Sequence, residues 1–415
     1  MSLICISLGS HLCQSPRATR EASALSAAGH DVLVVGPIFT EQHAAEDQEL
    51  LKSVSWQYRP TIDLRQRRAS RIDRLCLRGV RRGAAEVVRY TGIQLAESLG
   101  YGVRKTLGLV EGLPWDLHLG HHEVGCWVSY MLARKGRRVG ADFEDWYSRD
   151  LLPEAQKSRP LRLLRRVEHY LLHHAAHLST TSHVMAAAMR QAYGGQLPEV
   201  VYNVFPWSER NSIDNRTLDR VDKTMPSLHW VSKVIGPGRG LELLFEALKS
   251  VITPVGVHLR GSHNGQIAAT LHSQFPTVQG HRLFLHQPVP AKELLSRISE
   301  HDIGLALELS QPPSRDLTIT YKFFHYLLGG LAVVATDTTG QTEIADSIPD
   351  AVSIASQANP KDLAITITGL VSNKRRLVAA KAAALAVAET RFSWEQQLPH
   401  LVQSVERALA QCMGS

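Results

Sequence analysis

Short apolar runs alternate with helical stretches along almost the whole chain. Residues 3–8 are typical of a buried strand, and residues 16–28 carry apolar side chains at helical spacing before Gly29, a residue that favours the end of a helix. Residues 31–35 then predict the next strand. Because strands that alternate with helices build parallel sheets covered by helices, the repeated pattern predicts an α/β protein.

The alternation falls into two blocks. A polar stretch over residues 207–226, rich in Asp, Arg, Asn and Ser, interrupts it and predicts a linker. We therefore expect one Rossmann-like domain over residues 1–206 and a second over residues 227–391, which suits a chain of 415 residues. Ligands of parallel sheets bind at the carboxyl ends of the strands, so two such domains predict a site in the cleft that they face.

Composition limits the class of protein further. No apolar run approaches the roughly 20 residues that cross a bilayer. The N-terminus has no basic flank and no apolar stretch long enough for a signal peptide. Five scattered cysteines predict neither a disulfide framework nor a zinc site. We expect a cytoplasmic protein in a reducing compartment.

Basic charge is concentrated between Arg65 and Arg89. This segment has nine arginines and two acids, interleaved with Leu and Val. Basic and apolar residues together favour an anionic surface, and we expect the inner face of a membrane. Nucleic acid is not expected, because no aromatic stacking pattern accompanies the charge. The alternative is a solvated helix whose arginines pair with acids elsewhere.

Two junctions between a predicted strand and a predicted helix have the residues of an anion site. Free backbone N–H groups and the helix dipole favour negative charge at such junctions. The first runs from Gly9 to Arg20 and includes Arg17. The second runs over residues 232–240 and has three glycines and two cations. Neither has the glycine spacing of a dinucleotide-binding or P-loop motif, and a purely structural turn is the alternative for the second.

Five segments, in this order, resemble glycosyltransferase family 4, which has the GT-B fold. They are residues 15–32, 202–206, 236–242, 321–337 and 392–395. The resemblance implies transfer of a sugar from a nucleotide-diphosphate-sugar donor to an acceptor. The expected donor is a UDP- or GDP-sugar, and the expected acceptor is lipid-linked, a polysaccharide precursor or another small molecule. It also implies retention of configuration, no cofactor, no bound metal, and a C-terminal helix over residues 392–415 that returns to the first domain.

The resemblance implies roles for individual residues. The catalytic candidates are His121, Lys233 and Arg239. The donor-binding candidates are Gly9, Arg17, Ser232, Gly238, Gly261, Lys322, His325 and Glu343. The candidates on the acceptor side are His122, Asp142, Glu144 and Asp145, although Asp142 to Asp145 could instead cap a helix or pair with an arginine. The histidines near positions 118–122 and 173–177 complete no known set of metal ligands.

The chain departs from the family pattern at one point. Many members have two glutamates eight positions apart, and this chain has Leu317 and His325 in those places. A neutral imidazole accepts a hydrogen bond from a ribose hydroxyl less well than a carboxylate does, and we expect Glu343 to share the task. Two alternatives therefore stay open: a sugar-nucleotide epimerase of the same fold, and a catalytically inactive partner subunit.

Overall fold

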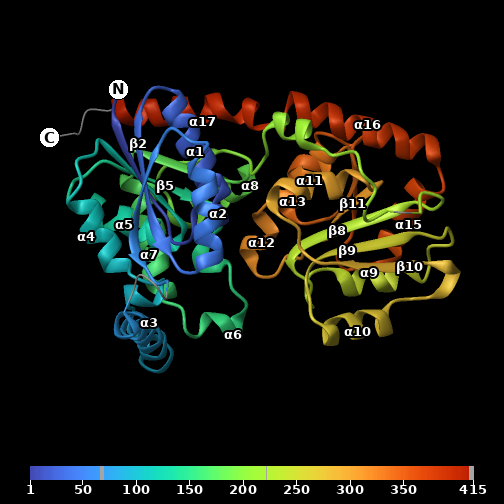
Figure 1. Ribbon diagram of the computed structural model, residues 1–415, viewed down its shortest axis with the longest axis horizontal. Coiled ribbons are helices and arrows are strands. Elements are labelled where there is room, and N and C mark those ends of the chain that lie inside the picture. The colour runs from blue at the N-terminus through green and yellow to red at the C-terminus, as the bar shows by residue number, and fades with distance from the viewer. Residues whose placement is uncertain (66–69, 221, 411–415) are drawn as a thin grey trace. The chain divides into compact units, whose positions relative to one another are not determined.

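The computed structural model describes residues 1–65, 70–220 and 222–410. It divides the chain into two units (Figure 1). Unit 1 contains Met1–Val201 and the C-terminal stretch from Leu398, and unit 2 contains Tyr202–Gln397. Each unit is a parallel sheet with helices on its faces, which confirms the predicted fold class.

The sheet of unit 1 has seven parallel strands in the order β3-β2-β1-β4-β5-β6-β7. The strands are β1 (Leu3–Ser7), β2 (Asp31–Ile38), β3 (Gln57–Asp63), β4 (Leu117–His121), β5 (Val139–Phe143), β6 (His177–Thr180) and β7 (Glu199–Val200). Ile4 of β1 pairs with Val32 on one side and with Leu117 on the other. The strand order therefore reverses direction at β1 and β4, which is where parallel sheets open a ligand site.

Unit 1 has eight α-helices before its last one, within the described residues. They are α1 (Pro16–Ala27), α2 (Glu41–Leu51), α3 (Arg71–Thr91), α4 (Val103–Glu111), α5 (His122–Ala133), α6 (Pro153–Gln156), α7 (Leu161–His174) and α8 (His183–Tyr193). The last helix, α17 (Trp394–Ala410), also belongs to unit 1 from Leu398 onward. His177 of β6 lies 3.0 Å from the hydroxyl of Ser404 on α17, so this helix packs against the first sheet.

Strand β4 and helix α5 approach each other very closely. A Cβ atom on Gly120 would lie 2.2 Å from the carbonyl oxygen of Gly125. Only glycine at position 120 therefore allows the tight turn from β4 into α5, and this turn carries His121 and His122.

The sheet of unit 2 has six parallel strands in the order β10-β9-β8-β11-β12-β13. The strands are β8 (Ser227–Val234), β9 (Gly256–Ser262), β10 (Arg282–His286), β11 (Ile303–Ala306), β12 (Ala332–Thr336) and β13 (Val352–Ala355). The helices are α9 (Leu241–Leu248), α10 (Gly265–Gln274), α11 (Ala291–Ser299), α12 (Pro313–Leu317), α13 (Tyr321–Gly329), α14 (Thr339–Ala345), α15 (Pro360–Val371) and α16 (Lys374–Thr390). Fully buried side chains such as Trp230, Leu259 and Val334 fill the space between sheet and helices.

Residues 207–226 are not a linker in the structure. Over the described residues of this segment, acids bind to arginines of unit 2: Asp214 pairs with Arg297 at 2.6 Å, and Asp219 pairs with Arg260. The polar composition therefore reflects ion pairs with buried arginines of the second unit rather than a solvated connection.

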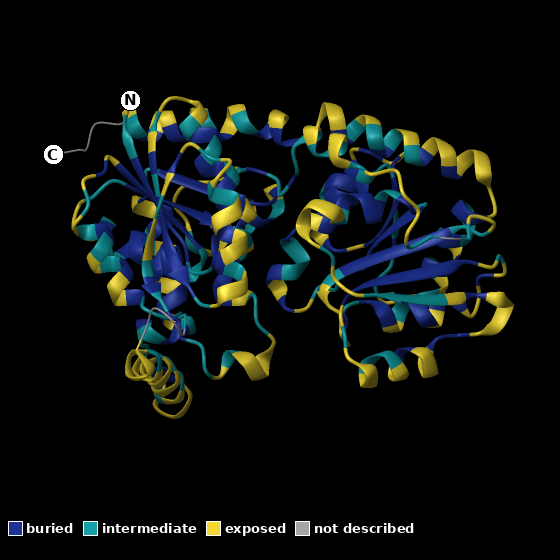
Figure 2. Cartoon of the chain, viewed as in Figure 1, coloured by how far each residue is buried: buried dark blue, intermediate teal, exposed yellow. Residues whose placement is uncertain are grey.

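Burial differs sharply between the sheets and α3. Figure 2 shows dark-blue central strands in both units and a largely exposed α3. In the described part of the chain, no helix combines the length and the apolar character needed to span a bilayer.

Candidate active site

The loop between β8 and α9 lies at the carboxyl edge of the sheet in unit 2 and is the candidate anion site. Gly238 and Gly240 have φ angles of +69° and +80°, and the backbone then enters α9. One guanidinium nitrogen of Arg239 donates a hydrogen bond to the Ser232 hydroxyl at 3.1 Å, which fixes the half-buried side chain beside the loop. Lys233 is exposed next to it. The predicted phosphate residues therefore lie together, with two cations beside the start of a helix.

Close packing fixes the shape of this loop. A Cβ atom on Gly240 would lie 2.6 Å from the carbonyl oxygen of Leu307, and one on Gly261 would lie 2.6 Å from the carbonyl oxygen of Ser232. Gly261 on β9 thus supports the strand end that carries Ser232. The carboxylate of Glu242, in the first turn of α9, accepts the Gly238 N–H at 3.0 Å.

Lys322 was predicted to bind the donor, but the structure places it in a buried ion pair. Its ammonium lies 2.6 Å from Glu308, which follows β11, and 5.4 Å from the centre of the Trp230 ring. Burial alone would raise the pKa of Glu308, but Lys322 lowers it below the usual range. The charge of Lys322 is therefore neutralised by Glu308 rather than available to a diphosphate.

His325 on α13 and Glu343 on α14 have different surroundings. The ring of His325 is stacked on Phe205 with 3.5 Å between centroids. Glu343 on α14 accepts a hydrogen bond from the Tyr202 hydroxyl at 3.0 Å. Binding of the donor by these two residues stays a prediction.

In unit 1, Gly9 and His122 meet at the carboxyl edge of the sheet. The Gly9 N–H donates to His122 Nδ1 at 3.2 Å, so the neutral ring carries its proton on Nε2. His122 has a φ angle of +60°, a left-handed conformation unusual for a residue with a side chain. Burial lowers the pKa of His122, and this favours the neutral ring. Such a histidine could donate Nε2–H to a sugar hydroxyl.

The preference for His121 over His122 needs correction. The side chain of His121 is 2% exposed and its Nε2 bonds to Glu21 of α1. Burial alone would lower the pKa of His121, but Glu21 raises it above the usual range. Because His121 is held inside unit 1 by an acid, the geometry favours His122 as the histidine that contacts a ligand.

The expectation that Arg17 binds the donor is also corrected. Its guanidinium forms a buried ion pair with Asp142 at 2.7 Å and donates to the carbonyl oxygen of Val201 at 2.5 Å. Asp142 also accepts from the Ser179 hydroxyl at 2.6 Å. Arg17 and Asp142 therefore hold α1, β5 and β6 together, whereas Glu144 and Asp145 after β5 are half-buried and remain acceptor-side candidates.

Removing the carboxylate of Asp142 should strongly destabilise unit 1. Burial alone would raise the pKa of Asp142, but Arg17 lowers it to about 2, so the group is ionised and needed as the counter-charge. We expect Asp142→Ala to cost about 3–5 kcal/mol in the free energy of unfolding, the typical effect of leaving a buried charge unpaired. Urea denaturation measures this. The double variant Arg17→Met with Asp142→Leu should recover most of the loss, and an unchanged denaturation midpoint for Asp142→Ala contradicts the assignment.

A further cluster, which the sequence did not indicate, contains His11, Cys13 and Asp47. Both ring nitrogens of His11 are bonded: Nδ1 donates to Asp47 at 2.6 Å, and Nε2 accepts the Phe39 N–H at 2.7 Å. Burial raises the pKa of the Cys13 thiol above its usual range, and Asp47 raises it further. A neutral thiol is a poor metal ligand. We interpret this cluster as a brace between the loop after β1 and the loop after β2.

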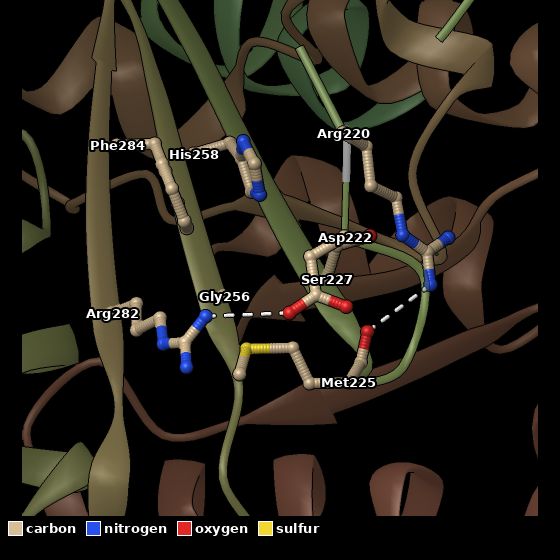
Figure 3. A pocket seen from close by; sticks show the side chains of 8 residues that line it. All are labelled: Arg220, Asp222, Met225, Ser227, Gly256, His258, Arg282 and Phe284. Atoms are coloured by element: carbon tan, nitrogen blue, oxygen red, sulfur yellow. Dashed lines mark hydrogen bonds and ion pairs between the residues drawn. The ribbon is translucent and has the colours of Figure 1, made fainter.

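A small cavity of about 140 Å³ lies at the opposite edge of the second sheet, where β8, β9 and β10 begin (Figure 3). Its wall includes Arg220 and Arg282. Arg282 pairs with Asp222 at 3.3 Å, and Arg220 pairs with Asp302 at 2.7 Å. Because both cations are neutralised and the strands start here, this cavity has no part in the candidate site.

Comparison with known proteins identifies the fold class. The chain is similar to sucrose-phosphate synthase from Thermosynechococcus elongatus, with 14% identity, a TM-score of 0.70, and coverage of 99% of this chain and 100% of that one. It is similar to Anabaena HepE in complex with UDP and glucose, with 16% identity, a TM-score of 0.67, and the same coverage. A third structure is from E. coli, described as trehalose-6-phosphate bound with UDP-2-fluoro glucose, with 13% identity, a TM-score of 0.65, and coverage of 99% of each chain. No curated relative matches in sequence.

The two parallel sheets, each with a reversal in strand order, and these similarities show that the chain has the GT-B fold. In sequence, residues 14–206 match the model of the Glycosyl transferase 4-like domain. The resemblance to family 4 glycosyltransferases is thereby confirmed for nearly the whole first unit.

Proposed function

We propose that this chain is a retaining glycosyltransferase that moves a sugar from a UDP- or GDP-sugar to a lipid-linked, polysaccharide-precursor or other small acceptor. One observation carries the proposal. In a chain whose first unit is a glycosyl transferase 4-like domain, the second unit presents Lys233 and Arg239 beside a glycine loop that opens α9. The likeness to HepE, which was crystallised with UDP and glucose, supports the choice of a UDP-sugar.

The proposed chemistry uses positive charge where negative charge develops. The bond between the anomeric carbon and the diphosphate breaks, and the diphosphate leaves with the electron pair. An acceptor hydroxyl forms the new bond on the same face and passes its proton to an oxygen of the departing diphosphate. Arg239, Lys233 and the N–H groups at the start of α9 would stabilise the leaving diphosphate. These groups supply the charge that a metal ion supplies in other transferases, so we propose that no metal is needed.

Unit 1 would bind the acceptor. His122, with its proton on Nε2, would bind a sugar hydroxyl, and Glu144 or Asp145 would orient the acceptor hydroxyl. His325 and Glu343 would contact the ribose of the donor.

A thermal-shift screen against UDP-, GDP-, ADP- and dTDP-sugars tests the donor. A ligand that binds only the folded state at 100 times its Kd stabilises by about 2.7 kcal/mol, and we expect UDP-glucose or a GDP-sugar to raise the Tm accordingly. Failure of all four classes to bind contradicts the proposal and favours an inactive subunit. Product analysis without acceptor separates a transferase from an epimerase, because only an epimerase changes the configuration of the sugar.

We also propose that α3 attaches the protein to an anionic membrane surface. Ile72, Leu75, Val80 and Tyr90 of this helix are 54–77% exposed. Apolar side chains beside arginines are typical of helices that lie in the interfacial layer. The segment 66–69, which contains two of the predicted arginines, lies outside the described residues.

Replacing Ile72 and Val80 by Ser should weaken sedimentation with anionic vesicles by about tenfold or more, because each side chain loses roughly 1 kcal/mol or more of apolar burial. Ile365→Ser with Val378→Ser, at exposed positions of unit 2, is the matched control and should leave sedimentation unchanged. Equal binding by all three proteins would discard the attachment through α3.

A further inference from the structure

An arginine-lined groove of about 620 Å³ lies between α3 and the ends of β2 and β3 in unit 1. It is lined by Phe39, Thr40, Glu41, Leu64, Arg65, Arg71, Arg74, Leu75 and Arg78. Four guanidinium groups thus line one hollow, together with the apolar side chains of Phe39, Leu64 and Leu75. The proposed transfer of a sugar does not use any of these residues.

Two kinds of arginine meet in the groove. Arg65 is held rigidly, because Asp63 accepts from its Nε and Nη2, the latter at 2.6 Å, and Glu41 lies 3.7 Å away. Arg71, Arg74 and Arg78 project from α3 at helical spacing, so they share one face. Glu41 is the one acid among the lining residues, so four guanidinium groups against one carboxylate leave a net positive groove.

The groove adjoins the apolar stripe of α3. This stripe consists of the exposed side chains of Ile72 and Leu75, on the same turn of the helix as Arg71 and Arg74, and Leu75 itself lines the groove. On the other side Arg81 packs over the Tyr101 ring at 4.6 Å, which fixes the helix against unit 1. A ligand that fits both features has an anionic head and an apolar tail.

The chemistry of the groove favours phosphate as the anionic head. Guanidinium groups bind phosphate oxygens through paired N–H donors, and several of them together match its charge. A soluble phosphate would leave the adjacent apolar stripe uncovered. Nucleic acid would need aromatic platforms, and Phe39 is the one aromatic residue among those that line the groove.

We propose that this groove binds the phosphate head group of an anionic membrane lipid, with the apolar stripe of α3 inserted beside it. The inference rests on the membrane attachment proposed above and not on the donor assignment. The groove is also tied to the reaction edge of unit 1, because His11, in the loop after β1, accepts the N–H of Phe39 in the groove wall. Lipid binding would thus hold that edge at the membrane surface.

Sedimentation with vesicles tests the proposal. The wild-type protein should bind phosphatidylcholine vesicles that contain 30% phosphatidylglycerol and should not bind pure phosphatidylcholine vesicles. The triple variant R71Q/R74Q/R78Q should bind on the order of 100-fold more weakly, as expected for three arginines at an anionic surface. R71K/R74K/R78K should fall between the two, because it keeps the charge and loses the paired donors.

The matched control is R162Q/R165Q/R166Q, which removes the same charge from exposed positions of α7 in the same unit. It should bind within about threefold of wild type. An equal loss in the control shows diffuse attraction and overturns the groove. If inorganic pyrophosphate raises the Tm of the wild type while vesicles do not bind, the ligand is a soluble anion and the lipid proposal is overturned.

The donor screen keeps the two proposals apart. Each arginine variant should keep the wild-type thermal response to UDP-sugar, which shows that it folds. Vesicle binding without any response to a nucleotide-sugar would leave the groove supported while contradicting the proposed transferase.

Discussion

Replacing Arg239 by Ala is expected to lower turnover of a nucleotide-sugar by about 100-fold, the typical loss on removal of one charge-stabilising donor. The reason lies in its position. The guanidinium is fixed by its hydrogen bond to Ser232, beside Gly238 and the start of α9, where a departing diphosphate would gain charge. Steady-state rates of nucleoside-diphosphate release measure the effect, and kcat should fall more than KM rises.

Arg282→Ala is the matched control, because Arg282 is an exposed arginine of the same unit at the opposite edge of the sheet. It should leave turnover within about twofold of wild type, the range expected for an exposed ion pair of little energetic weight. Lys233→Ala should show a loss similar to that of Arg239→Ala. Full turnover in both Arg239→Ala and Lys233→Ala contradicts the assignment of this loop to the diphosphate.

Most of the fold could be predicted from the sequence, because strands buried in parallel sheets have continuous apolar sequences. This prediction missed two strands, β3 and β13, which lie at the edges of their sheets. β3 (Gln57–Asp63) contains Pro60, Arg59 and Asp63, and an edge strand tolerates such residues because one side of it needs no partner. β13 has only four residues, and Ser353 interrupts its apolar run, so it lacks the pattern of a buried strand.

The site could be predicted only in part. The loop over residues 232–240 stays a predicted phosphate site, and the sequence indicates it because glycines and cations are adjacent there. The ion pairs of Arg17, His121 and Lys322 could not be predicted because their acid partners are distant or unmarked in sequence. Asp142 lies 125 positions from Arg17, and Glu21 lies 100 positions from His121. Spacing along one chain does not indicate which buried cation is already neutralised.

Mild acid, between pH 6.5 and pH 5, is expected to unfold unit 2. A group of histidines lies inside this unit: the ring of His229 is stacked on His301 at 4.6 Å, and the ring of His258 lies 4.4 Å from that of His301. All three are at most 3% exposed. Burial lowers the pKa of His258 to about 3 and lowers those of His229 and His301 well below 6.5. The neighbouring arginines Arg220 and Arg260 lower them further.

The sign follows from proton binding. In the unfolded chain these histidines have a pKa near 6.5. Below that pH the unfolded state therefore binds protons that the folded state does not bind. Stability is therefore complete above pH 6.5 and falls as the pH decreases toward the folded pKa. At pH 5 each histidine lowers the free energy of unfolding by about 2 kcal/mol, and the three together by about 6 kcal/mol. This loss is comparable to the whole stability of a typical domain.

Pulse proteolysis in urea at pH 7, 6 and 5, with fragments identified by mass, follows unit 2 separately from unit 1. The midpoint for unit 2 should fall steeply between pH 6.5 and pH 5. The double variant His229→Phe with His301→Phe keeps two stacked rings without titratable nitrogens, so it should lose about two thirds of that dependence. His272→Gln, an exposed histidine of the same unit, should keep all of it. Equal slopes for the double variant and for His272→Gln would show that the buried rings do not control the acid transition.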